Sequence, residues 1–320
     1  MANSGNANAC VDGMKDAEEI CKIAAKKFKT INLDIKDDEI LVASTGIIGK
    51  KIDIEKIREI VEKLNLNDSD SKKAAKAIMT TDTKIKEISF EYKGIKIGGI
   101  EKGAGMIQPN MATMLCFLTT NADFNNEILQ ECLTEAVGQS FNVITVDGCM
   151  STNDTVILLS DRTKKCSIGD FKFLLNFATI ELAKKIVKDG EGATKFLEIS
   201  VEGANSKEKA INIARAIANS NLVKTAFFGE NLNWGRIISA AGSVEKVIFE
   251  KISLKFVDLD TKKEVEILEK GISKIDKEKN EIMKGKNLKI ILNLNEGGEK
   301  ATVYTSDLSF DYVKINAEYN

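Results

Sequence analysis

The hydrophobic positions of the chain follow two spacings, one of three to four residues and one of two. The first spacing marks one face of a helix, and the second marks one face of a strand. Helical spacing predicts helices over residues 14–28, 53–64, 127–137, 171–187 and 207–218. Shorter apolar or alternating runs predict strands over residues 40–43, 88–100 (a hairpin turning at 93–94), 114–118, 156–159, 196–201, 247–257, 288–294, 301–304 and 308–315. Helices and strands mixed along the whole chain are typical of the α/β class.

Three polar segments interrupt this pattern. Residues 1–13 are small, polar and glycine-bearing, which predicts a loop. Residues 44–46, Ser-Thr-Gly, are expected to form a turn after the strand at 40–43. Residues 65–73 form the clearest polar break, which is short enough for a connection within one domain. The 320 residues are enough for one sizeable domain or two closely packed ones.

The charge pattern excludes several kinds of partner. The 46 basic and 48 acidic residues are interleaved, so the chain offers no basic field for nucleic acid. No apolar stretch approaches the ~20 residues that a membrane span requires. The N-terminus has neither the basic nor the apolar region of a signal peptide. A cytoplasmic protein is the resulting expectation.

Residue types narrow the chemistry further. The chain has no histidine, which excludes Ser–His and Cys–His pairs and an imidazole base. A nucleophile would need a lysine, a carboxylate or a terminal amine as its base. The six cysteines contain no Cys-x-x-Cys pair, so we expect reduced thiols, with Cys116 and Cys149 in the core.

The segment from Lys102 to Ala122 is the most constrained part of the chain. Two glycines and the only proline precede Thr113, which stands at the start of a predicted buried strand. An ordinary structural threonine explains this pattern. If the Ala112–Thr113 bond were cut, however, the new α-amine would titrate near ~8 and could act as the base for the Thr113 hydroxyl.

Eight motifs resemble one known family, and they occur in the family's order from end to end of the chain. The segment KGAGMIQPNMATML resembles the self-cleavage segment of the glutamate N-acetyltransferases, also called ornithine acetyltransferases, of arginine biosynthesis. The other seven family-like segments are NSGNANAC (3–10), STGIIG (44–49), TTDT (80–83), DGCMSTNDT (147–155), DGEGATK (189–195), NWGRI (233–237) and DYVKINAEY (311–319). A single motif would be weak evidence, but eight in order are strong.

The resemblance implies a layered helix–sheet–sheet–helix fold and cleavage between Ala112 and Thr113. The products would be an α chain, residues 1–112, and a β chain, residues 113–320, intertwined in one globular body as α2β2 or a higher assembly. Acetyl would pass from N2-acetyl-L-ornithine to L-glutamate through an ester on Thr113. No metal or organic cofactor is implied, and the residues leave open whether acetyl-CoA is a further donor.

The resemblance assigns Thr45 and Gly46 to an oxyanion hole, although Ser-Thr-Gly alone would indicate only a turn. Lys102 matches a family lysine that would hold a substrate carboxylate or keep the Thr113 amine unprotonated. Without the resemblance, Lys102 would be an ordinary surface lysine.

Glu191 matches a substrate-binding glutamate suited to the side-chain ammonium of ornithine. In isolation the sequence around it predicts only an acidic loop at a helix end. Asn316 matches a family asparagine that binds substrate, and the resemblance also places Thr81 and Asn110 beside the pocket.

Both ends depart from the family pattern. Family members carry a substantial segment before NSGNANA and end in a threonine beyond the position of Asn320, so we expect a chain clipped at both ends. Two alternatives therefore stay open. One is a hydrolase or aminopeptidase with the same nucleophile, which would release ornithine without glutamate. The other is an inactive remnant or assembly subunit, which would not cleave itself.

Overall fold

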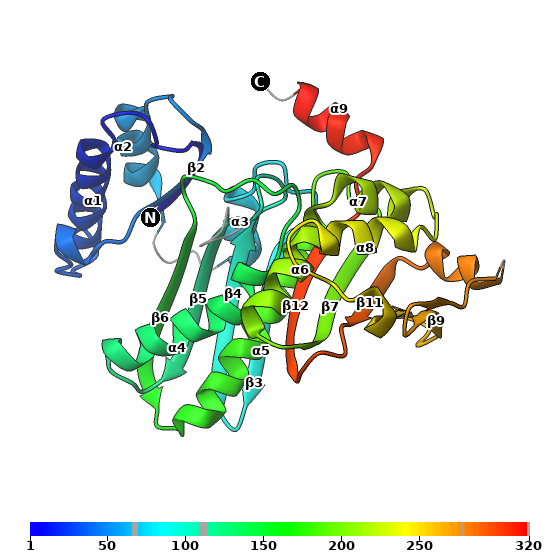
Figure 1. Ribbon diagram of the computed structural model, residues 1–320. Coiled ribbons are helices and arrows are strands. Elements are labelled where there is room, and N and C mark those ends of the chain that lie inside the picture. Colours follow the sequence, from blue (N-terminus) through cyan, green and yellow to red (C-terminus); the bar gives the residue numbers. More distant parts are fainter. Residues whose placement is uncertain (66–69, 109–113, 277, 319–320) are drawn as a thin grey trace. The chain divides into compact units, whose positions relative to one another are not determined.

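The computed structural model describes residues 1–65, 70–108, 114–276 and 278–318. Within these limits the chain forms two compact units, one of residues 1–103, 114–135 and 150–178, and one of residues 104–108, 136–149 and 179–318. The division falls inside two helices, α4 (Asn126–Gln139) and α5 (Ile168–Lys188). Each unit combines helices with its own sheet (Figure 1), which confirms the predicted α/β class.

The first unit contains a four-stranded sheet in the order β3-β4-β5-β6. Its strands are β3 (Lys86–Tyr92), β4 (Ile95–Lys102), β5 (Leu115–Ala122) and β6 (Thr155–Lys164), with only the β5–β6 pair parallel. The predicted hairpin is confirmed: Lys93 and Gly94, both at positive φ, form its two-residue turn. Helices α4 and α5 cross one face of the sheet (Figure 1), where the Phe90 and Phe177 ring centroids lie 4.9 Å apart.

The N-terminal residues of the first unit form a second, two-stranded parallel sheet. It consists of β1 (Ala2–Asn6) and β2 (Ala43–Ile47), beside helices α1 (Gly13–Lys29), α2 (Ile54–Lys63) and α3 (Ser71–Ala77). The prediction of a loop over residues 1–13 is wrong for β1, and residues 44–46 are strand rather than turn. The small polar residues of β1 have little intrinsic strand preference, so its backbone pairing with β2 decides the structure.

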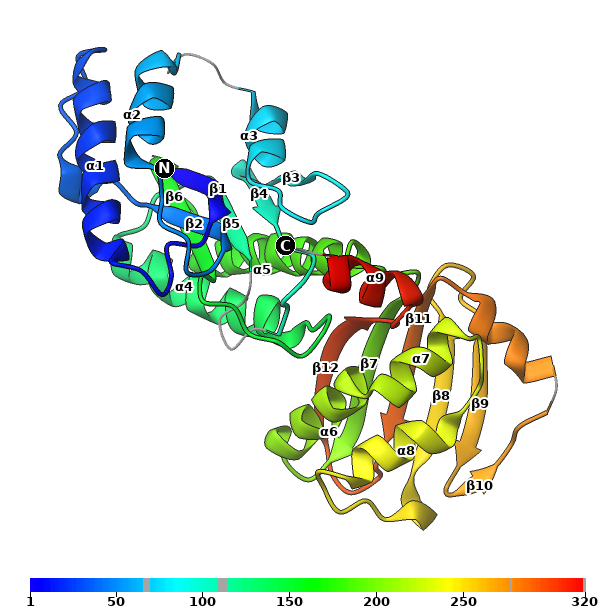
Figure 2. The same ribbon diagram turned by 90° about the horizontal axis from the view of Figure 1, so that it is seen from above.

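The second unit contains a six-stranded sheet in the order β10-β9-β8-β11-β7-β12, in which only the β11–β7 pair is parallel. The strands are β7 (Phe196–Ala204), β8 (Ser253–Asp258), β9 (Glu264–Glu269), β10 (Ile272–Ser273), β11 (Asn287–Asn293) and β12 (Glu299–Ser306). Helices α6 (Lys207–Asn219), α7 (Asn221–Phe228) and α8 (Trp234–Gly242) lie over one face of this sheet (Figure 2).

The core of the second unit lies between this sheet and its helices. Ile213 and Ile217 on α6 are fully buried against alternate sheet residues such as Ile199 and Ile290. Ser206 begins α6, because its side chain accepts a hydrogen bond from the Lys209 backbone N–H. The periodicity predicted α6 and β7 correctly, since each shows one clean apolar face.

The prediction of a strand over residues 308–315 is wrong. Residues 310–315 belong to α9 (Phe310–Glu318), a helix with no buried residue. The sequence also failed to predict α7, α8 and β9. The strand expected over residues 247–257 begins only at Ser253, after a 3₁₀ turn at Phe249–Lys251.

Candidate functional site

Two of the predicted site residues, Thr45 and Lys102, meet in the first unit. Thr45 lies in the middle of β2 and is 9% exposed, while Lys102 is the last residue of β4 and is 4% exposed. The Lys102 Nζ donates a hydrogen bond of 3.2 Å to the Thr45 Oγ1. An ammonium group can only donate, so the Thr45 hydroxyl accepts here and keeps its own proton for another acceptor.

Gly46 follows Thr45 at a point where β1 and β2 approach closely. Its φ is +130°, and a Cβ at this position would lie 2.3 Å from the carbonyl carbon of Gly5. Only glycine fits both the conformation and the space. Local backbone packing alone therefore explains why this position is glycine.

A buried carboxylate, Asp82, organises the backbone around Lys102. It accepts hydrogen bonds from the Lys86 Nζ at 2.6 Å and from the backbone N–H groups of Gly103 and Thr80 at 2.7 and 3.1 Å. Burial acts to raise the pKa of Asp82, but the Lys86 ammonium, the Gly103 N–H and Lys102 outweigh it, so this pKa lies below its ordinary value. Thr81 is half-buried and comes directly before Asp82 in the same turn.

Two further predicted residues, Glu191 and Asn316, meet in the second unit. The Asn316 side chain, on α9, donates hydrogen bonds to the Glu191 Oε2 at 2.8 Å and to the Tyr312 carbonyl at 3.0 Å. The Glu191 backbone N–H donates to the Ala104 carbonyl at 2.9 Å. A Cβ on Gly105 would lie 2.3 Å from the Glu191 carboxyl group, so glycine leaves the space in which this carboxylate sits.

The proposed nucleophile Thr113, its neighbour Ala112 and the candidate Asn110 lie outside the described residues. The chain on either side is held by aspartate side chains. Within the second unit, Asp147 accepts hydrogen bonds from the N–H groups of Met106 and Ile107. Within the first unit, Asp154 accepts one of 3.0 Å from the N–H of Met114.

Comparison with known proteins decides the family. The ArgJ family model matches residues 1–320. This chain belongs to the ArgJ family. The resemblance inferred from the sequence motifs is thereby confirmed.

Curated relatives of the family match the chain over its full length. A glutamate N-acetyltransferase of Methanocaldococcus jannaschii is 46% identical over 340 residues, covering 100% of this chain and 83% of the relative. The arginine biosynthesis bifunctional protein ArgJ 1 of Clostridium acetobutylicum is 42% identical, covering 100% and 81%.

A solved ArgJ structure also resembles this chain. The crystal structure of arginine biosynthesis bifunctional protein ArgJ from Bacillus halodurans shares 34% identity at a TM-score of 0.58. The match covers 63% of this chain and 98% of that one. It agrees with the α/β class that both units of the ArgJ-family chain show.

Sequence reasoning missed three aspartates in this ArgJ-family chain: Asp82, Asp147 and Asp154. All three lie inside motifs that carried the resemblance, TTDT and DGCMSTNDT. Aspartate in a short polar segment often accepts backbone N–H groups, and that is the signal that could have revealed them. Their actual partners are distant in sequence, so the pattern alone could not name them.

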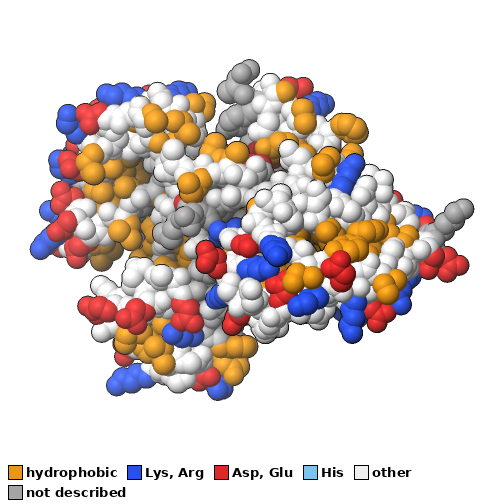
Figure 3. Space-filling model, in the orientation of Figure 1, with side chains coloured by type: hydrophobic (Ala, Val, Ile, Leu, Met, Phe, Trp, Pro, Cys, Tyr) orange, Lys and Arg blue, Asp and Glu red, His pale blue; other side chains and the backbone are white. Residues whose placement is uncertain are grey.

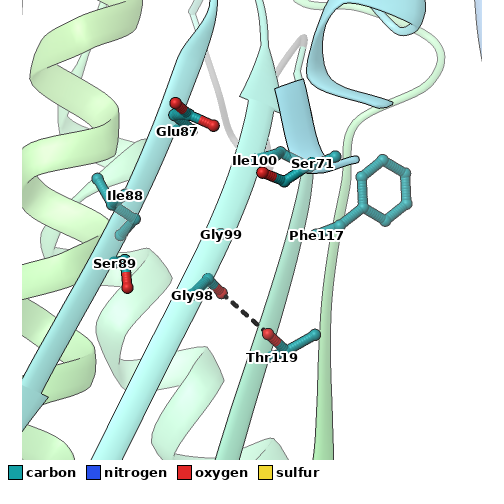
Figure 4. A pocket seen from close by; sticks show the side chains of 9 residues that line it. All are labelled: Ser71, Glu87, Ile88, Ser89, Gly98, Gly99, Ile100, Phe117 and Thr119. Carbon is teal, nitrogen blue, oxygen red and sulfur yellow. Dashed lines mark hydrogen bonds between the residues drawn. The ribbon is translucent and has the colours of Figure 1, made fainter. Parts of the chain in front are cut away.

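One further hollow lies on the face of the four-stranded sheet opposite Ile97, Cys116 and Leu118. It encloses about 720 Å³ and is lined by β3, β4, β5 and the first residue of α3. In Figure 4 the Thr119 hydroxyl reaches the Gly98 carbonyl at 3.4 Å across adjacent strands. None of the predicted site residues lines this hollow.

The two cysteines expected in the core differ in exposure. Cys116 is buried, and burial raises its pKa well above the ordinary thiol value. Cys149 was expected in the core, but it is exposed. It lies in a loop, where its backbone N–H donates to the Asp147 carboxylate.

Among the described residues, no group of three or more acidic or cysteine side chains could hold a metal ion. No helix among these residues has the length and apolar character of a membrane span. Basic and acidic side chains are mixed over the face shown in Figure 3.

Proposed function

We propose that this chain is an acetyltransferase of arginine biosynthesis that moves acetyl from N2-acetyl-L-ornithine to L-glutamate. The observation that carries the proposal is the family match over residues 1–320, together with a full-length relative named glutamate N-acetyltransferase. Within each unit a pair of predicted site residues supports it, Thr45 with Lys102 in the first and Glu191 with Asn316 in the second.

The reaction would proceed in two steps on Thr113 after cleavage of the Ala112–Thr113 bond. In the first, the Thr113 hydroxyl attacks the acetyl carbonyl of N-acetylornithine and gives its proton to its own α-amine. That proton passes to the leaving nitrogen, which departs as ornithine, and an acetyl ester remains. In the second, the glutamate α-amine attacks the ester, releasing N-acetylglutamate and restoring the hydroxyl. The absence of histidine is no obstacle, because the terminal amine is the base.

Thr45 and Lys102 would serve the developing oxyanion. The Thr45 hydroxyl accepts from a buried ammonium, which polarises its O–H and makes it a stronger donor toward a negative oxygen. Preorganised donors of this kind contribute about 3–4 kcal/mol in other enzymes. Gly46, fixed by its contact with Gly5, would supply the neighbouring backbone.

Glu191 and Asn316 would recognise the amino acid. The Glu191 carboxylate already accepts from the Asn316 amide, which orients it and leaves its other oxygen for the side-chain ammonium of ornithine. Asn316 is itself held by the Tyr312 carbonyl, one turn earlier on α9. Thr81 stays a proposed contact on the resemblance alone.

Maturation would yield an α chain of residues 1–112 and a β chain of residues 113–320, assembled as α2β2 or larger in the cytoplasm. No metal or organic cofactor enters the two steps. Acetyl-CoA is a donor to be tested beside N-acetylornithine, since the Clostridium relative is named bifunctional.

Steady-state kinetics test the proposal. With both substrates varied, a double-displacement mechanism predicts parallel double-reciprocal lines, and ornithine should exchange into N-acetylornithine without glutamate. Intersecting lines with no exchange would contradict it.

The hydrolase alternative predicts steady ornithine release without glutamate, at a rate that added glutamate does not change. The names of the two curated relatives favour transfer over hydrolysis. A chain that neither cleaves nor transfers acetyl would instead support the inactive alternative.

A further inference from the structure

We infer that Asp147 is a positioning residue for self-cleavage, holding the backbone just upstream of the Ala112–Thr113 bond. The inference rests on the proposed function, because it concerns the bond whose cleavage that proposal requires. It assigns to Asp147 a role in maturation.

The Asp147 carboxylate gathers three backbone donors. One oxygen accepts from the Met106 N–H at 2.6 Å, and the other accepts from the Ile107 and Cys149 N–H groups, both at 3.0 Å. Hydrogen bonds to an ionised acceptor are roughly twice as strong as those between neutral groups. One side chain from another loop therefore holds the backbones of two consecutive residues, Met106 and Ile107.

The backbone that Asp147 holds is one that needs support. Met106 has φ +56°, in the left-handed region that residues other than glycine rarely adopt. Residues 104–108 belong to no helix or strand, so no regular ladder holds them there. Side-chain acceptors supply that restraint instead.

Gln108, the last described residue before the scissile bond, has a second anchor. Its side-chain oxygen accepts from the Asn219 amide and from the Thr145 hydroxyl, the latter at 3.3 Å. Thr145 is 1% exposed and lies two residues before Asp147. Ile107 is fully buried, and its carbonyl accepts from the Val146 N–H at 2.7 Å. Residues 106–108 are thus each held by the 145–147 segment.

This arrangement matters because self-cleavage is an intramolecular attack. Such a reaction is fast only when nucleophile and carbonyl are held about 3–3.5 Å apart, and a displacement of about 1 Å can cost about 100-fold in rate. The contacts of residues 106–108 hold the described part of the chain that leads to the scissile bond. The burial of Ile107 and its bond to Val146 do not depend on the Asp147 side chain, so its loss should loosen this segment without unfolding the unit.

The test is the rate at which the freshly synthesised precursor is converted into two chains, followed by intact mass. Asp147→Asn keeps one acceptor oxygen, and Asp147→Ala keeps none. We expect cleavage about tenfold slower in Asp147→Asn and about 100-fold slower in Asp147→Ala, in proteins that stay folded but lose some stability. The matched control is Asp258→Asn. Asp258 also accepts two backbone N–H groups of a turn in the second unit, those of Asp260 and Thr261, and this variant should cleave at the parent's rate.

A second variant keeps the inference testable if the Asp147 variants do not fold. Thr145→Val retains shape and burial but removes the hydroxyl that contacts the side chains of Asn219 at 2.7 Å and Gln108 at 3.3 Å, and it should also slow cleavage. An uncut parent would refute the proposed function itself. A parent that cleaves, beside a folded Asp147→Ala or Asp147→Asn protein that cleaves equally fast, would overturn the inference alone.

Discussion

Thr45 and Thr120 are both buried threonines on strands of the first unit, but they face different partners. The Thr120 hydroxyl donates to the Lys96 carbonyl, whereas the Thr45 hydroxyl accepts from the Lys102 ammonium. We expect Thr45→Val to lower the rate constant of acetyl transfer about 100-fold, because an oxyanion donor is lost. Thr120→Val should lose some stability but keep the parent's rate. Equal rates for parent and Thr45→Val would remove Thr45 from the mechanism.

The close approach of Gly105 to Glu191 gives a second prediction at the residue scale. The atoms that a new Cβ would meet are the flexible end of the glutamate side chain, so Gly105→Ala should displace the carboxylate rather than unfold the protein. We expect the KM for N-acetylornithine to rise about tenfold. Gly138→Ala, where a Cβ meets open space, is the control and should leave this KM unchanged. A normal KM in Gly105→Ala would show that Glu191 does not contact the donor.

Residue identity predicted much of the candidate site, but not the aspartates that hold the backbone around it. The motifs pointed to Thr45, Lys102, Glu191 and Asn316 one by one. The structure joins them into two pairs, because Lys102 donates to Thr45 and Asn316 donates to Glu191. Their roles stay predictions. Asp82 went unpredicted because its partners are backbone groups of Thr80 and Gly103, and no spacing of side chains records such contacts.

At the scale of elements, the sequence predicted best where an element buries one apolar face. Helix α6 and strand β7 show such faces, and their bounds were close to correct. Strand β1 and helix α9 show none, because β1 is held by backbone pairing and no residue of α9 is buried. Both were predicted wrongly for that reason.

Removing helix α9 therefore tests separately what this element contributes to stability and what it contributes to substrate binding. It has no fully buried residue, so a chain ending after Ser309 should lose little free energy of unfolding, about 1 kcal/mol or less. The same truncation removes Asn316 and should raise the KM for the amino-acid substrates at least about tenfold. Asn316→Ala should reproduce most of that rise. A truncated chain with normal KM values would exclude α9 from the binding site.

At the scale of the whole molecule, Lys224 links pH to stability. Its side chain is 2% exposed and donates to the Thr305 hydroxyl at 3.0 Å and to the Ser306 carbonyl at 2.5 Å. Burial lowers the pKa of Lys224 to about 8, with Asp307 and Asp147 opposing the shift. Between pH 8 and about 10.5 the unfolded chain holds a proton that the folded chain has lost, so this residue's contribution to stability rises with pH.

The measurement is chemical denaturation of the parent and of Lys224→Met at pH 7.5 and pH 10. The free energy of unfolding of the parent, relative to that of the variant, should increase between these pH values, with a ceiling of roughly 3 kcal/mol. A difference that is constant or falls with pH would show that Lys224 stays charged in the folded protein.

In the proposed mechanism Thr113 becomes N-terminal and carries the acetyl group. The direct measurement is intact mass spectrometry of the purified protein after mixing with N-acetylornithine in the absence of glutamate, beside Thr113→Ala. We expect two fragments in the parent, one ending at Ala112 and one beginning at Thr113, the latter heavier by one acetyl group. Thr113→Ala should stay one uncut, unmodified chain. An uncut parent, or an acetyl group on any other residue, would rule out this mechanism.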